Sequence, residues 1–132
     1  MATLSFDHIH YRYSDPIAIS EFYFGIMEAI DLGSVDLKGI PNRQFELGGA
    51  TLLFVYEGDK LLPPVSAAEK LGVYHIAFLV TDCCAATEYY RGKGAAVAIE
   101  PFMASDTIKA SFLSAPDGML LELKQIITSS IS

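Results

Sequence analysis

The sequence is poor in basic residues and contains no long apolar run. Lys and Arg together number 9, against 16 Asp and Glu, and the formal net charge is −7. A surface this acidic repels phosphate backbones and anionic lipid headgroups, so nucleic acid and membranes are not expected as partners. The longest apolar stretches, such as residues 76–80, are far too short to span a bilayer.

Cysteine is also scarce, and its placement predicts a cellular setting. Cys83 and Cys84 are adjacent, so they cannot close an ordinary disulfide loop. The first seven residues lack the basic segment and apolar core of a signal peptide. Free thiols without an export signal predict a cytoplasmic protein.

The composition that remains is that of a folded domain. The chain has 132 residues, of which 52% are hydrophobic and 19% charged. This excludes intrinsic disorder and predicts one compact domain with a sizeable core.

The chain repeats itself. A shift of 67 residues places His8 on His75, and seven of the 18 positions from residue 8 to residue 25 are identical to their counterparts. Near the ends of the repeat the shift becomes 69, which places Leu53 on Glu122. Because the identities include polar residues with no packing reason to recur, they indicate an internal duplication rather than coincidental patterning.

Each half shows the same order of elements. Alternating apolar residues predict strands at residues 4–13, 35–38, 43–47 and 50–56, and a helix at 17–28 that Asp15 caps. The second half repeats this with strands at 73–80, 95–100, 107–114 and 119–126, and a helix at 83–92 capped by Asp82. We therefore predict an α+β fold of two βαβββ modules in tandem, forming a curved mixed sheet around a central cleft. Module one is 1–57, the linker 58–72, module two 73–126 and the tail 127–132.

Three residues could hold a metal ion. Side chains alternate along a strand, so His8 shares a face with His10 and Arg12, and the duplication makes His8 equivalent to His75. Glu122 is the one acid in the apolar run 119–123, where an unpartnered carboxylate is costly. Two imidazoles and a carboxylate that meet in a cavity would bind one divalent ion (Fe, Mn, Ni, Co or Zn) and leave positions open for substrate.

Other polar residues could complete such a site. His10 could act as a proton shuttle, could be a hydrogen-bonded wall residue, or could replace His8 as the ligand. Glu57 and Glu46 are alternative bases. Arg12 could bind a substrate carboxylate or phosphate, or pair with a surface acid.

The motifs resemble those of the vicinal oxygen chelate superfamily, which includes glyoxalase I, methylmalonyl-CoA epimerase, extradiol dioxygenases and bleomycin resistance proteins. The matching pieces are residues 6–9, 14–23, 72–78 and 116–123. The resemblance implies metal ligands at His8, His75 and Glu122, a small-molecule substrate and a homodimer. Leu53 stands where glyoxalase I and the epimerase carry a fourth ligand. Phe102, Ala110 and Phe112 stand where fosfomycin thiol transferases bind phosphonate, so that chemistry is not expected.

The resemblance implies three possible functions. The first is a metal-dependent isomerase or lyase of the glyoxalase/epimerase type, with His10 or Glu57 moving a proton. The second is an Fe(II)-dependent extradiol-type dioxygenase. The third is a metal-free ligand-sequestering protein like the bleomycin resistance proteins.

Overall fold

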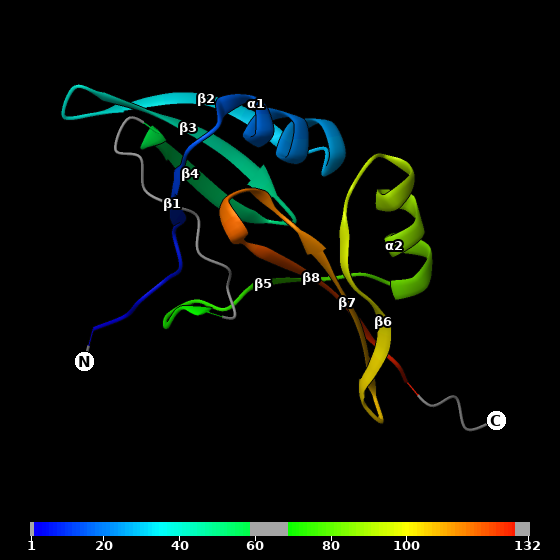
Figure 1. Cartoon of the computed structure of the whole chain (residues 1–132). Coiled ribbons are helices and arrows are strands. Elements are labelled where there is room, and N and C mark those ends of the chain that lie inside the picture. Colours follow the sequence, from blue (N-terminus) through cyan, green and yellow to red (C-terminus); the bar gives the residue numbers. More distant parts are fainter. Residues whose placement is uncertain (1, 59–68, 129–132) are drawn as a thin grey trace. The chain divides into compact units, whose positions relative to one another are not determined.

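The computed structural model describes residues 2–58 and 69–128, which form two compact units, Met1–Leu62 and Pro63–Ser132. Both units have the predicted order βαβββ (Figure 1). The first contains β1 (Ile9–Tyr13), α1 (Pro16–Ile19), a π-helical stretch η1 (Ser20–Ile26), β2 (Ile30–Leu37), β3 (Ile40–Leu47) and β4 (Ala50–Tyr56). The second contains β5 (Ile76–Leu79), α2 (Cys83–Gly92), β6 (Val97–Ser105), β7 (Ile108–Ser114), the 3-10 turn η4 (Pro116–Gly118) and β8 (Leu120–Ile126). Most of the predicted linker and tail lies outside the described residues.

Each unit has its own four-stranded mixed sheet. The strand order is β1-β4-β3-β2 in the first unit and β5-β8-β7-β6 in the second. The first strand of each unit runs parallel to the last, and the other neighbours are antiparallel. This confirms the prediction of two βαβββ modules with mixed sheets.

The strand register confirms the duplication. Ile9 pairs with Leu52 in the first unit, and Ile76 pairs with Leu121 in the second. These are the same positions after shifts of 67 and 69 residues. One step further along, His10 pairs with Leu53 where the second unit pairs Ala77 with Glu122.

The first strand of each unit is shorter than predicted. Strand pairing begins at Ile9 and at Ile76, so His8 and His75 each lie directly before a strand. The alternation rule that placed His8 on one face with His10 therefore applies only from Ile9 onward. The preceding residues alternate in sequence, but the ladder to β4 starts at Leu52, and they have no strand partner among the described residues.

The predicted helix at 17–28 is replaced by one turn of α-helix followed by the π-helical stretch. Phe22 and Tyr23 are both buried there, with their rings packed edge to face at 4.8 Å. The wider turn of a π-helix brings two consecutive aromatic side chains against the sheet, where an ideal α-helix would place them 100° apart. Tyr23 contacts the stacked rings of Phe45 and Phe54, whose centroids are 4.4 Å apart.

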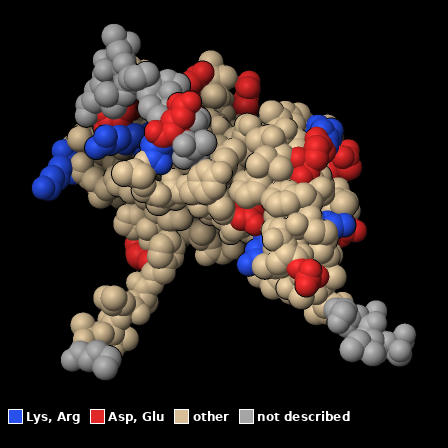
Figure 2. All heavy atoms as spheres, turned by 60° about the horizontal axis from the view of Figure 1, so that its bottom comes forward, with Lys and Arg blue, Asp and Glu red and all other residues tan. Residues whose placement is uncertain are grey.

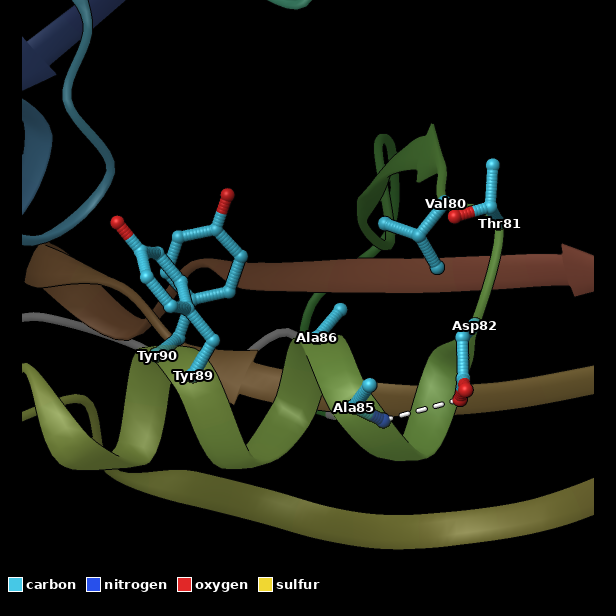
Figure 3. A pocket seen from close by; sticks show the side chains of 7 residues that line it. All are labelled: Val80, Thr81, Asp82, Ala85, Ala86, Tyr89 and Tyr90. Atoms are coloured by element: carbon cyan, nitrogen blue, oxygen red, sulfur yellow. Dashed lines mark hydrogen bonds between the residues drawn. The ribbon is translucent and has the colours of Figure 1, made fainter.

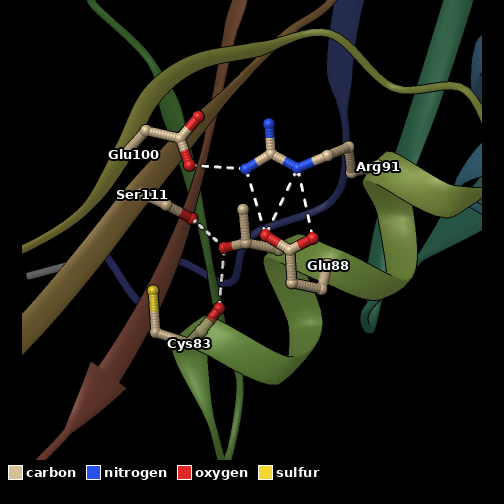
Figure 4. A network of polar contacts seen from close by, with 6 residues as sticks. Cys83, Glu88, Arg91, Glu100 and Ser111 are labelled. Atoms are coloured by element: carbon tan, nitrogen blue, oxygen red, sulfur yellow. Dashed lines mark hydrogen bonds and ion pairs between the residues drawn. The ribbon is translucent and has the colours of Figure 1, made fainter.

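The second unit keeps the predicted helix at 83–92 unchanged. Asp82 caps it by accepting a hydrogen bond from the Ala85 N–H at 3.0 Å (Figure 3). On the buried side, the Thr87 hydroxyl donates to the Cys83 carbonyl and contacts the Ser111 hydroxyl, both at 2.7 Å (Figure 4). These bonds anchor α2 to β7.

A second, exposed contact joins α2 to β6. Arg91 pairs with Glu88 on its own helix and with Glu100 on β6 (Figure 4). The hydrogen bond from Arg91 holds the pKa of Glu100 below its usual value, and the Glu100 carboxylate raises the pKa of Arg91. Elsewhere, on the face shown in Figure 2, charged side chains are scattered over a largely uncharged surface. Of the helices described, none has the length and apolar character needed to cross a membrane.

Candidate functional site

His75 and Glu122 form a close polar pair in the second unit. The Nε2 atom of His75 lies 2.7 Å from Oε1 of Glu122, and the two side chains are 26% and 13% exposed. The strands bring them together: β5 begins one residue after His75 and runs beside β8, where Glu122 pairs with Ala77. Of the three residues predicted as metal ligands, these two therefore lie in contact.

One ring nitrogen of His75 lacks a hydrogen-bond partner among the described residues. This atom, Nδ1, is buried. A buried polar atom without a partner costs about 1–3 kcal/mol. The edge of the Phe112 ring lies against the imidazole at 5.0 Å, so the surroundings on that side are apolar.

The donor set fits a divalent metal ion. An imidazole nitrogen and a carboxylate oxygen are the usual protein ligands of Zn, Fe, Mn, Ni and Co. Two neighbouring ligand atoms, each ~2.1 Å from one ion, lie about 3 Å apart, close to the 2.7 Å between these atoms. His75 and Glu122 could thus share an ion after a small shift.

His8, the third predicted ligand, lies in the first unit. Its Nδ1 is 2.7 Å from the carboxylate of the neighbouring residue Asp7, and the His8 side chain is 37% exposed. Within either unit, the described residues form no group of three His, Cys, Asp or Glu side chains that could hold an ion. The three-residue set of His8, His75 and Glu122 therefore remains a prediction.

His10 has a buried partner that sequence analysis missed. Its Nε2 lies 2.7 Å from Oδ1 of Asn42, whose side chain is almost fully buried on β3. The Nδ2 group of Asn42 donates to the Ile40 carbonyl at 3.1 Å, so Oδ1 is the acceptor that faces His10. In neutral His10 the proton then sits on Nε2, and Nδ1 keeps a free electron pair. No sequence signal points to Asn42, because the contact joins residues 32 positions apart.

The two predicted bases, His10 and Glu57, lie at one depression of the first unit. Both line an open depression of about 390 Å³ at the end of β1 and β4, with Arg12, Tyr11 and Val55. Glu46 is not part of this lining, since it pairs with Thr51 near the other end of β4. The first unit thus brings an imidazole, a carboxyl group and a guanidinium to one depression.

A second depression, of about 510 Å³, lies beside α2 (Figure 3). Tyr89 and Tyr90 rise along one side of it, and Val80 and Ala86 line it elsewhere. None of the predicted site residues lines it.

Comparison with known proteins shows the fold. No family model and no curated protein matches the sequence. Among solved structures, a glyoxalase family protein from Enterococcus faecalis is 22% identical, with a TM-score of 0.72 over 92% of this chain and 97% of that one. A glyoxylase/bleomycin resistance protein/dioxygenase domain from Frankia sp. EAN1pec is 14% identical, with a TM-score of 0.76 over 97% and 96%. The fosfomycin resistance protein FosX from Listeria monocytogenes is 20% identical, with a TM-score of 0.68 over 94% of each chain.

These likenesses show the fold. The chain shares the fold of these glyoxalase-like and fosfomycin resistance structures over nearly its whole length. At these identities the likeness does not extend to a particular activity.

Proposed function

We propose that the protein is a divalent-metal-dependent isomerase or lyase of the glyoxalase/epimerase type, which moves a proton on a small substrate with two adjacent oxygens. The observation that carries the proposal is the His75–Glu122 pair, an imidazole and a carboxylate 2.7 Å apart in a recessed, partly apolar setting. In a duplicated fold, the repeat of His75 is a second histidine, His8. We take these three residues as the metal ligands.

A metal ion bound there would act as a Lewis acid, favouring loss of a proton beside a chelated carbonyl. The protein's own contribution is the base. His10 accepts the proton at Nδ1, because its Nε2–H is held by the buried Asn42. Glu57 lines the same depression and is the alternative acceptor.

The apolar residue at position 53 favours a metal site with three protein ligands. Leu53 pairs with His10 in the sheet and is nearly buried, so no fourth protein ligand comes from β4. A three-ligand set leaves more positions open for substrate oxygens or water.

We further propose that the two units act together as one domain over residues 1–132, and that the protein works as a cytoplasmic homodimer on a small molecule. The solution mass by light scattering tests the dimer: a monomeric mass at micromolar concentration would contradict it.

Two measurements test the enzymatic proposal. Elemental analysis after mild purification should find a divalent metal, and His75→Ala should lose it. The metal-loaded protein should catalyse the exchange of the hydrogens beside the carbonyl of dihydroxyacetone for deuterium from the solvent. NMR measures the rate of this exchange. His10→Gln should abolish exchange while metal content stays.

Other outcomes favour the alternatives. Oxygen uptake with catechol by the iron-loaded protein would favour the dioxygenase. Absence of metal, with no rescue by Fe, Mn, Ni, Co or Zn, would favour a metal-free binding protein and overturn our proposal.

A further inference from the structure

The histidine pair of the first unit offers a binding site of its own. The rings of His8 and His10 lie next to each other, with centroids 6.1 Å apart and planes inclined at 65°. The third histidine of the chain, His75, contacts Glu122 in the second unit. The four side chains proposed above as metal ligands and base are therefore grouped two and two, one pair in each unit.

Both rings of the first pair have one nitrogen held and one nitrogen free. Nδ1 of His8 lies 2.7 Å from the Asp7 carboxylate, which can only accept, so the proton sits on Nδ1 and Nε2 keeps its electron pair. In neutral His10 the contact to Asn42 places the proton on Nε2, and Nδ1 keeps its electron pair. A histidine that binds a metal almost always donates its other ring N–H to such a partner.

The spacing of the two rings suits one shared ion. With a metal–nitrogen distance of ~2.1 Å, the ion lies about 3.2 Å from each ring centre, so two rings on one ion have centroids about 4.5–6.4 Å apart for angles of about 90–180° at the metal. The observed 6.1 Å lies in this range, toward its open end. The His8 side chain is 37% exposed, so its ring has room to turn toward the ion.

The chemistry of the pair selects the kind of ion. Imidazole nitrogens suit Cu²⁺, Ni²⁺ and Zn²⁺, whereas Mg²⁺ and Ca²⁺ prefer oxygen. The net charge of −7 and the neighbouring Asp7 favour a cation. They act against Arg12, whose positive charge lines the same depression as His10.

We propose that His8 and His10 form a second metal site, which binds Cu²⁺, Ni²⁺ or Zn²⁺ and shuts the enzyme off when the ion is in surplus. The inhibition rests on the proposed function, in which His8 is a ligand and Nδ1 of His10 is the base. Two ligands bind more weakly than three, so this site fills only after the active site. An ion held there occupies Nδ1 of His10 and takes His8 from the three-ligand set, leaving the first ion on His75 and Glu122.

The binding test is a titration of the metal-free full chain with Cu²⁺, followed by electron paramagnetic resonance. His75→Ala removes the imidazole of the second unit, and Cys84→Ser removes the exposed thiol that could react with Cu²⁺. In this double variant, one Cu²⁺ should bind with hyperfine coupling to two nitrogens. Adding His8→Gln or His10→Gln should leave one nitrogen and weaken binding at least ~10-fold, since loss of an outer-shell partner alone has an effect of that size. Adding Glu21→Gln, which removes an exposed acid of the same unit, should change neither.

The inhibition test is the deuterium exchange of dihydroxyacetone by the wild type. The chain with one equivalent of Ni²⁺ should be active. Surplus Ni²⁺ should lower the rate at least ~10-fold, because a general base contributes about 10²–10⁴-fold to a proton transfer. Equilibrium dialysis should show a second Ni²⁺ bound over the same range of concentration.

The outcomes separate the second site from the proposed function. Coupling to fewer than two nitrogens in the double variant, or an equal loss of binding with Glu21→Gln, would overturn the second site. Full activity with two Ni²⁺ bound would overturn the inhibition. Two-nitrogen binding of Cu²⁺ with no exchange at any Ni²⁺ concentration would leave the second site intact and reject the proposed function, and exchange without the two-nitrogen signal would do the reverse.

Discussion

Replacing Glu122 by Gln tests the candidate metal centre in a way that stability can report. Gln is nearly isosteric and still offers an oxygen to Nε2 of His75, so the local packing is retained. Without metal, a hydrogen bond to a charged group is exchanged for a neutral one, which costs about 1 kcal/mol. Since the Glu122 side chain is only 13% exposed, little of this is lost to solvent screening.

The larger effect appears when metal is added. A metal present at 100 times its dissociation constant stabilises the wild type by about 2.7 kcal/mol. For a chain of this length that raises the melting temperature by roughly 8–13 °C. If loss of the anionic ligand weakens binding 100-fold, the same metal concentration stabilises Glu122→Gln by only about 0.4 kcal/mol, or under ~2 °C.

The assay is thermal unfolding followed by circular dichroism, with Ni²⁺ or Zn²⁺ titrated against each variant. Glu21→Gln is the matched control, since Glu21 is an exposed acid on η1 and far in sequence from the candidate ligands. It should show the full metal-induced shift. The reasoning fails if Glu122→Gln retains that shift, or if the wild type shows none.

Three further predictions follow from single contacts. Burial raises the pKa of Tyr11 to about 12, so the folded chain holds this proton more tightly than the unfolded chain. The stabilisation is complete below pH 10, and the free energy of unfolding falls by about 1–2 kcal/mol as the pH rises to 12. Tyr11→Phe should remove this component of the pH dependence, measured by urea unfolding. Phe54→Ala should cost about 3–5 kcal/mol because it empties the centre of the aromatic core, whereas Phe54→Leu, which copies Leu123 at the equivalent position of the second unit, should cost less than half as much by the same measurement. Asn42→Ala should slow deuterium exchange by about 10-fold at unchanged metal content, because His10 loses the bond that orients it; an unchanged rate would remove Asn42 from the site.

Local signals in the sequence predicted much of the fold. Asp15 and Asp82 cap their helices as expected, and α2 and β4 have the predicted bounds. These features depend on residues close in sequence, such as a capping aspartate and the backbone N–H that donates to it. The duplication added long-range information, because it required that the two halves share one register, and they do.

What the sequence could not predict depends on distant partners. β1 and β5 begin at Ile9 and Ile76, where their pairing with β4 and β8 begins, and alternation in the sequence alone cannot show this boundary. The π-helical stretch depends on how Tyr23 packs against Phe45 and Phe54. Of the candidate site, His75 and Glu122 were both singled out from the sequence, and they lie in contact, while the buried Asn42 beside His10 was not predicted.

The way the two modules diverge fits the proposed division of roles between them. At each of several equivalent positions, one module carries a polar group where the other carries an apolar one. Under the proposed function, the second module supplies a carboxylate at Glu122 and the first supplies the base at His10, a division of roles that two identical halves could not provide. The positions, paired by the shifts of 67 and 69 residues, are His10 with Ala77, Arg12 with Leu79, and Leu53 with Glu122.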